Sequence, residues 1–191
     1  MKPTNTFSGL SRRQWLAAST SVAGLSLLPA GQLMANSLTN PLPNPHSPRW
    51  LDLQRSGERY LLNIADLQGW QKAAWLLRDE SAQTSAVPDA RLMAVLSWAQ
   101  AQLDYAGQPR VMVVSSGLRT HKTNAAIEGA AEKSMHLPDD QGVFKAVDLL
   151  GSPARLDAYY ELFNSIEGLG IGRYSTHLHV DTRGRNARWV G

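Results

Sequence analysis

The chain has 191 residues, of which 43% are hydrophobic and 18% charged, so it can bury one ordinary core and is neither disordered nor fibrous. Its net charge of +3 comes from the first 37 residues, where Lys2, Arg12 and Arg13 stand without an acidic residue; the rest holds 16 basic and 16 acidic residues. This near-neutral remainder offers no basic surface for nucleic acid, and the absence of cysteine excludes disulfides, thiolate zinc sites and cysteine nucleophiles.

Residues 1–37 have the layout of a secretory signal peptide. The pair Arg12-Arg13 precedes an apolar stretch over residues 16–28, and paired arginines at this place are typical of the twin-arginine export route. The stretch of about 13 residues is shorter than the roughly 20 that a membrane anchor needs. We therefore expect a twin-arginine signal peptide that is cleaved after Ser37 or Ala35, a periplasmic protein, and a mature chain that does not span a membrane.

A proline-rich linker is expected at residues 38–48, and the folded domain at residues 49–191. At the start of this domain, residues 50–53 and 60–64 predict two strands around a turn that contains Gly57. The first half of the domain therefore begins with a hairpin.

Two amphipathic helices are expected next, at residues 67–77 and 89–103, because both segments carry apolar side chains at helical spacing. A β-branched run at 110–115 predicts a buried strand, and residues 123–128 predict a short helix.

The remaining elements are strands at 144–150 and 178–182 with a helix over 156–166 between them. The order of strands and helices lacks the regular βαβ alternation of a nucleotide-binding fold. The sequence therefore predicts a single α+β domain.

Histidines and carboxylates gather near the ends of the later strands. His136 precedes Asp148, and the pair His177 and His179 precedes Asp181. Residues two apart in a strand share one face, so His177 and His179 point to the same side. Two imidazoles with an aspartate from a neighbouring strand supply the nitrogen and oxygen ligands of a catalytic zinc site. Spacing alone leaves a metal site and hydrogen-bonded strand histidines as alternatives.

Four motifs in chain order resemble the zinc D-Ala-D-Ala carboxypeptidase and endopeptidase family, whose fold is shared with the Hedgehog signalling domain. The motifs are Ser116-Gly117-Leu118-Arg119-Thr120, Ser134-Met135-His136, Ala146-Val147-Asp148-Leu149 and His177-Leu178-His179-Val180-Asp181. The likeness is closest to the twin-arginine-exported branch that includes murein endopeptidase K, and it extends from about Arg49 to the C-terminus. It implies a Hedgehog/DD-peptidase-like domain with a small antiparallel sheet and flanking helices.

The resemblance assigns a role to each motif. It implies that Zn²⁺ is held by His136, Asp148 and His179. Arg119 would hold a substrate carboxylate or stabilise the oxyanion, and Ser134 would contribute to substrate binding. His177 would be the catalytic base or the electrostatic partner of the oxyanion. Thr176 stands where some members of the family carry a glutamate, which leaves His177 as the nearby base.

The segment between His136 and Asp148 departs from the family pattern Ser-x-His-x-x-Gly-x-Ala-x-Asp, because it is five residues longer. Lengthening a loop costs little free energy. We therefore expect that the longer loop still delivers Asp148 to the metal but changes the shape of the cleft beside it.

The function implied by the resemblance is hydrolysis of peptide bonds in peptidoglycan by a zinc metallopeptidase, as an endopeptidase acting on crosslinks. The alternatives are a D,D- or L,D-carboxypeptidase that trims stem peptides and a non-catalytic zinc-containing domain that binds the cell wall. The expected partners are peptidoglycan peptides and, for the precursor, the twin-arginine export machinery.

Overall fold

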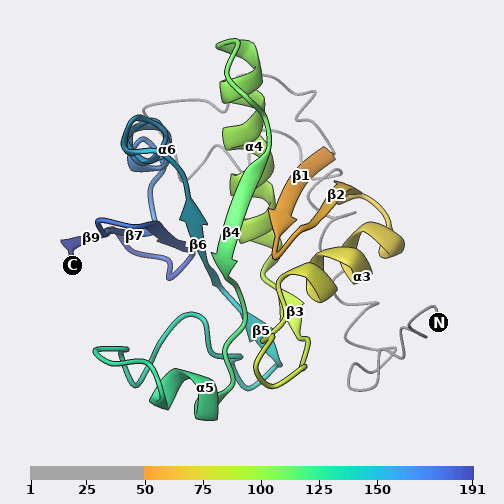
Figure 1. Ribbon diagram of the computed structural model, residues 1–191, viewed down its shortest axis with the longest axis vertical. Helices are drawn as coiled ribbons and strands as arrows, with labels where there is room; N and C mark the ends of the chain where they lie inside the picture. Colours follow the sequence, from red (N-terminus) through yellow and green to blue (C-terminus); the bar gives the residue numbers. More distant parts are fainter. Residues whose placement is uncertain (1–49) are drawn as a thin grey trace.

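The computed structural model describes residues 50–191, shown in colour in Figure 1. The expected signal peptide at 1–37 and the expected linker at 38–48 lie outside the described residues. No helix among residues 50–191 combines the length and apolar character needed to cross a bilayer.

A seven-stranded sheet is the centre of the domain, with the strand order β2-β1-β4-β6-β8-β7-β9. Its strands are β1 (Trp50–Arg55), β2 (Glu58–Asn63), β4 (Met112–Ser116), β6 (Ala146–Leu150), β7 (Gly170–Arg173), β8 (Leu178–Asp181) and β9 (Ala187–Val190). A separate two-stranded sheet pairs β3 (Val87–Pro88) with β5 (Val143–Phe144). The helices among residues 50–191 are α3 (Leu67–Leu76), α4 (Ala90–Tyr105), α5 (His121–Ala125) and α6 (Pro153–Asn164).

The α+β class is confirmed, but the expectation of a small antiparallel sheet is wrong. The sheet is larger and mixed, because β1 pairs with β4 and β7 pairs with β9 in parallel. The chain between β1 and β4 passes through two helices, which gives it the length for a parallel crossover. β9 runs opposite to β8 but lies beyond β7, so its pairing with β7 is parallel.

Local chemistry explains where several elements begin. Ser56 and Gly57 both have positive φ, at 48° and 83°, which suits the tight turn between β1 and β2. Asp66 caps α3 by accepting a hydrogen bond from the backbone N–H of Gly69. Ser152 caps α6 in the same way, with Pro153 at its first position.

Strand alternation divides the central strands into an apolar face and a polar face. Val147 and Leu149 of β6 are fully buried in one core cluster with side chains of α3, α4 and α6. Asp148 lies between them in the sequence and therefore faces the other side of the sheet. In β8 the alternation places His179 on this same polar face, and the register pairs His179 directly with Asp148. The polar face therefore brings two of the expected ligands together.

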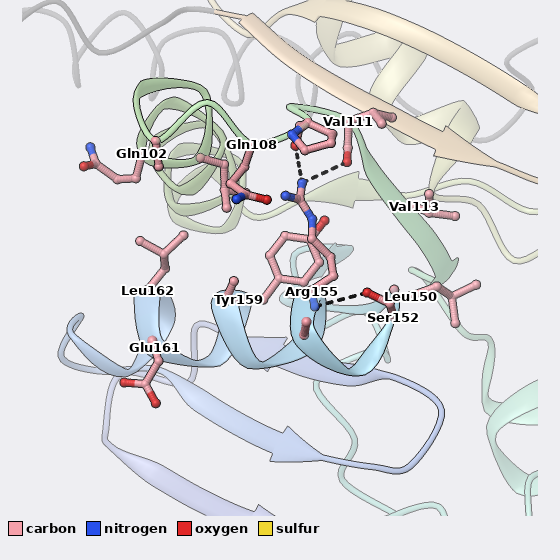
Figure 2. Close-up of a pocket in the computed structure, with 16 residues that line it drawn as sticks. Gln102, Gln108, Val111, Val113, Leu150, Ser152, Arg155, Tyr159, Glu161 and Leu162 are labelled. Atoms are coloured by element: carbon pink, nitrogen blue, oxygen red, sulfur yellow. Dashed lines mark hydrogen bonds between the residues drawn. The ribbon is translucent and has the colours of Figure 1, made fainter.

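A groove of about 700 Å³ lies between α4 and α6 on the side of the helices (Figure 2). Arg155 crosses it, with its guanidinium over the Tyr159 ring at 4.7 Å and hydrogen bonds to the carbonyls of Pro109 and Val111. The side chains that line it include none of the expected ligand or catalytic residues. This groove is therefore distinct from the site on the polar face.

Candidate metal centre

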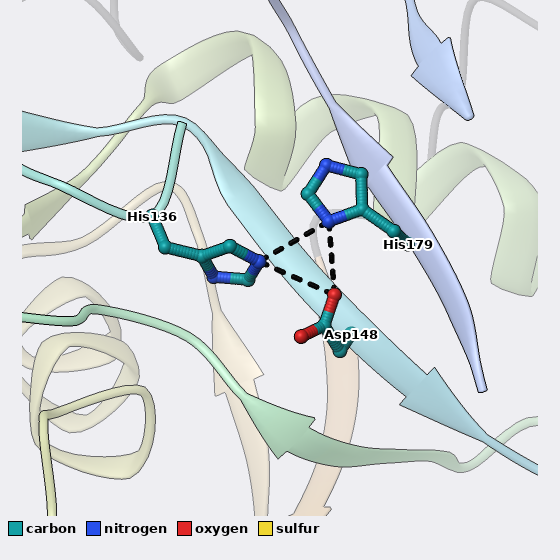
Figure 3. Close-up of side chains that lie close together, drawn as sticks. All are labelled: His136, Asp148 and His179. Atoms are coloured by element: carbon teal, nitrogen blue, oxygen red, sulfur yellow. Dashed lines mark hydrogen bonds and ion pairs between the residues drawn. The ribbon is translucent and has the colours of Figure 1, made fainter. Parts of the chain in front are cut away.

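Three side chains from separate segments converge on the polar face: His136 from the loop before β5, Asp148 from β6 and His179 from β8 (Figure 3). We call these three residues the metal group. His136 Nε2 lies 3.2 Å from Asp148 Oδ1 and 3.1 Å from His179 Nδ1, and His179 Nδ1 lies 2.9 Å from Asp148 Oδ1. All three side chains are buried.

The outer ring nitrogens of both histidines are bonded to oxygen acceptors. His136 Nδ1 donates to the carbonyl of Gly117 at 2.5 Å, and His179 Nε2 donates to Asp181 Oδ2 at 2.8 Å. A ring nitrogen that donates to a carbonyl or carboxylate carries the hydrogen. In the neutral rings, the lone pairs are therefore on His136 Nε2 and His179 Nδ1. Both lone pairs point at the same place as Asp148 Oδ1.

Burial and hydrogen bonding shift the pKa values of the three groups in different directions. Burial lowers the pKa of His136 more than its contact with Asp148 raises it. Burial also acts to lower the pKa of His179, but hydrogen bonds to Asp148 and Asp181 outweigh it and raise the pKa. Burial acts to raise the pKa of Asp148, yet hydrogen bonds from both histidines hold it well below its usual range.

This donor set fits a divalent zinc ion. Imidazole nitrogen and carboxylate oxygen are ordinary zinc ligands, and tetrahedral ligands about 2.0–2.1 Å from zinc lie about 3.3–3.4 Å from one another. The three ligand atoms here are 2.9–3.2 Å apart, so a small outward movement accommodates the ion. Three protein ligands leave a fourth position for water or substrate, which is the construction of a catalytic site rather than a structural one.

The longer loop between His136 and Asp148 folds back on itself, so its extra residues do not move Asp148 away from His136. Asp139 Oδ1 accepts hydrogen bonds from the backbone N–H groups of Gln141 and Val143, and Asp139 Oδ2 pairs with Lys145 Nζ at 2.9 Å. Gly142 adopts a φ of 77°, which favours glycine. With this loop in place, Asp148 Oδ1 lies 3.2 Å from His136 Nε2, and delivery of the carboxylate to a metal stays a prediction.

Arg119 lies beside the metal group, where it contacts the second oxygen of Asp148. Its Nη2 donates to Asp148 Oδ2 at 2.5 Å and its Nε donates to Ser116 Oγ at 3.0 Å. Its backbone N–H also donates to the carbonyl of His136 at 2.9 Å. This arrangement leaves Asp148 Oδ1 as the oxygen that faces the two histidines. The expected role of Arg119 toward substrate stays a prediction.

Ser134 orients the backbone at His136. Its hydroxyl accepts a hydrogen bond from the backbone N–H of His136 at 3.3 Å, and its carbonyl accepts from Leu137 at 3.1 Å. The serine therefore stabilises the turn that presents the ligand. Its expected contribution to substrate binding stays a prediction.

His177 immediately precedes β8, and its ring stacks on Tyr174 with centroids 4.3 Å apart and an interplanar angle of 8°. Its Nδ1 lies 3.0 Å from Thr176 Oγ1. Partial burial lowers the pKa of His177, and the charges of Asp148, His179 and Arg119 also influence it. His177 stands two residues before His179, and its lowered pKa favours the neutral imidazole, the form that can accept a proton.

Asp79 is a supporting residue that the sequence did not reveal. Its carboxylate is buried and accepts hydrogen bonds from the backbone N–H of Thr120 at 2.7 Å and of Ala82 at 3.1 Å. Burial acts to raise its pKa, but these hydrogen bonds hold the pKa below its ordinary value. Asp79 thus anchors the segment that carries Arg119. In the sequence it stands between Arg78 and Glu80 and looks like part of a surface charge run.

An α+β domain that directs two imidazole lone pairs and one carboxylate oxygen at a common point has the construction of a zinc-dependent hydrolase. The family model described as Peptidase M15 matches residues 70–181, which is more than half of the chain and includes every expected site residue. The chain therefore belongs to the peptidase M15 family and is a metallopeptidase of a zinc-dependent family. Comparison with curated proteins gave no match, and comparison with solved structures gave none either.

Proposed function

We propose that the protein is a zinc peptidase that cleaves peptide bonds in peptidoglycan, acting as an endopeptidase on crosslinks. The observation that carries the proposal is the convergence of three ligand atoms from His136, Asp148 and His179 in a chain of the peptidase M15 family. The motif order further supports a place in the exported branch that resembles murein endopeptidase K. The Arg12-Arg13 leader supports a periplasmic protein that meets peptidoglycan peptides after export by the twin-arginine machinery.

In this proposal zinc is held by the metal group through His136 Nε2, Asp148 Oδ1 and His179 Nδ1. Zinc held there would supply a Lewis acid that polarises the scissile carbonyl and lowers the pKa of a bound water toward about 7. Arg119 keeps the second oxygen of Asp148 occupied through its 2.5 Å contact, so Asp148 presents a single oxygen.

His177 is the proton acceptor in the proposed reaction. If its Nδ1–H donates to Thr176 Oγ1, the lone pair is on Nε2 and can take a proton from the attacking water. The same nitrogen can then return the proton to the leaving amine. The Tyr174 ring limits the rotation of the imidazole by stacking on its face.

Arg119 has donors beyond those that hold Asp148. A guanidinium carries five N–H groups, and the contacts with Asp148 and Ser116 use two of them. We assign the others to the oxyanion or to a substrate carboxylate, for which a planar cation is well suited.

The proposal is tested with purified protein, loaded with zinc, and two defined substrates: crosslinked muropeptide dimers and uncrosslinked pentapeptide monomers. Mass spectrometry should show dimers converted into monomers by addition of one water. Chelation should abolish this cleavage, and added zinc should restore it. Release of terminal D-alanine alone would identify a carboxypeptidase instead. Absence of cleavage by protein with one zinc per chain would overturn the peptidase assignment and favour a binding domain.

A further inference from the structure

A second cluster of side chains lies on the outer side of His179, away from the rest of the metal group. Asp181 follows two positions later in β8, is fully buried, and accepts a hydrogen bond from His179 Nε2 at 2.8 Å. Arg183 binds the same carboxylate: its Nε donates to Oδ1 at 2.8 Å and its Nη2 donates to Oδ2 at 2.5 Å. Asp181 therefore connects a partly buried cation with the ring of a proposed ligand.

Two glycines of β7 create the space for this cluster. The register pairs Gly170 with Asp181 and Gly172 with His179. A Cβ atom on Gly170 would lie 2.4 Å from Arg183 Nε and 2.5 Å from Asp181 Oδ2, closer than real Cβ contacts allow. A Cβ on Gly172 would lie 2.4 Å from Trp189 Nε1. The Gly-x-Gly pattern of β7 is thus required by side chains that support His179.

The ring of Trp189 completes the cluster. It lies against His179 with ring centroids 5.3 Å apart, and the guanidinium of Arg183 lies over it at 4.9 Å from the ring centroid. Its Nε1 donates to the hydroxyl of Tyr174 at 2.9 Å. The His179 imidazole is therefore fixed at one edge by a carboxylate and contacted by an indole.

A histidine can expose either ring nitrogen to a metal, and the partner of the other nitrogen decides which. On the other edge of the ring, Asp148 Oδ1 lies 2.9 Å from Nδ1 and would itself accept a hydrogen from that nitrogen, so this contact alone does not reserve Nδ1 for a metal. A carboxylate behind the ring accepts a hydrogen only from Nε2, which leaves the Nδ1 lone pair for the metal. A buried carboxylate is costly unless it is paired, and Arg183 supplies the compensating charge.

We propose that Asp181 is a positioning residue of the metal centre: it holds His179 as the Nε2–H tautomer and directs Nδ1 toward His136 and Asp148. Arg183 and Trp189 keep Asp181 and the imidazole in place. The proposal rests on the proposed function only in that the metal group binds zinc. Carboxylate partners of this kind contribute about 10–100-fold in metal affinity.

The experiment compares Asp181→Asn with a matched control, Asp52→Asn. Asp52 is also buried and forms the same two-point contact with an arginine, Arg59, at 2.9 and 2.7 Å, but it lies on β1 and has no contact with the metal group. Zinc affinity is measured by competition with a chromophoric chelator on chelator-treated full-length protein. We expect the zinc Kd to rise about 10–100-fold in Asp181→Asn and to stay within about twofold in Asp52→Asn.

A second readout separates positioning from stability. Long-range ¹H–¹⁵N spectra of the zinc-loaded protein report which nitrogen of His179 carries the hydrogen, and we expect Nε2–H in the native protein. Arg183→Lys keeps a cation beside Asp181 and should retain this tautomer, which provides a second variant if Asp181→Asn unfolds. Equal zinc affinity in both Asp→Asn variants, or an Nδ1–H tautomer in the native protein, overturns the inference while zinc peptidase activity can stand. A native protein that binds no zinc overturns the proposed function itself.

Discussion

Replacing His177 by alanine tests the proposed base, because the expected loss of stability is much smaller than the expected rise in the activation barrier. The structural contribution is the stack on Tyr174 at 4.3 Å, since the ring is only partly buried. Such an aromatic pair contributes about 0.5–1.5 kcal/mol. A positioned proton-transfer group contributes about 10²–10⁴-fold to turnover, which corresponds to about 2.7–5.4 kcal/mol in the barrier. The loss in activity should therefore far exceed the loss in stability.

Three measurements on His177→Ala check this prediction: zinc content, melting temperature and kcat on muropeptide dimers. We expect one zinc per chain, a small decrease in melting temperature and a kcat lower by about 10²–10⁴-fold. His121→Ala is the matched control, because this exposed histidine begins α5 and has no contact with the metal group. Unchanged kcat with full zinc would remove His177 from the mechanism. A parallel fall in zinc content and kcat would instead make it a fourth ligand.

Three further predictions address the ligands, the supporting carboxylate and the leader. Single alanine replacements of the metal group should each reduce zinc content in elemental analysis, and stoichiometric zinc in all three variants would refute the ligand set. The pKa of Asp79 is lowered in the folded protein, so its ionised carboxylate adds to the free energy of unfolding. This stabilisation is present above the unfolded pKa of about 3.9 and is lost as pH falls through the folded value. In metal-free protein, Asp79→Asn should lower the free energy of unfolding at pH 7 by about 1–3 kcal/mol. Denaturant titrations should show that the difference between variant and native protein shrinks toward pH 2. A difference that does not change with pH would show that ionisation of Asp79 is not its cause. Replacing Arg12 and Arg13 by lysine should retain the precursor in the cytoplasm on fractionation, and normal processing would exclude the twin-arginine route.

The hairpin and the longer helices could be predicted because their signals are local. Apolar spacing and a cap such as Asp89, whose side chain accepts from the backbone N–H of Leu92, depend only on nearby residues. The pairing of β1 with β4 depends on contacts between distant residues, so the parallel part of the sheet was missed. β7 was also missed, because glycines at 170 and 172 remove the alternating side chains by which a strand is recognised.

The convergence of the metal group was predictable from motif order together with strand alternation. Asp148 and His179 occupy the polar positions of neighbouring strands, so their pairing follows once β6 and β8 are adjacent. The partners that set the histidine tautomers could not be predicted in the same way. The carbonyl of Gly117 reaches His136 Nδ1 only because two loops meet in space, and a backbone acceptor has no signature in the sequence.

Arg119 and Asp79 show how far the centre depends on contacts between distant segments. Asp79 follows α3 and binds the backbone of Thr120, while the neighbouring Arg119 binds both the backbone of His136 and the carboxylate of Asp148. Hydrogen bonds through Thr120 and Arg119 therefore connect the segment after α3 with two proposed ligands. The buried carboxylate of Asp79 therefore anchors the segment that carries Arg119, a role that the neighbouring sequence does not indicate.

The C-terminal strand belongs to the same centre although it contributes no ligand. Trp189 of β9 contacts the ring of His179 and donates to the hydroxyl of Tyr174, whose ring stacks on His177. One indole thus touches the proposed ligand directly and reaches the proposed base through Tyr174. Gly172 is required on β7 because the indole occupies the volume of any side chain there. A chain that ended before β9 would keep all three ligand residues but would lose Trp189. The position of His179 relative to His177 would then no longer be fixed through the indole and Tyr174.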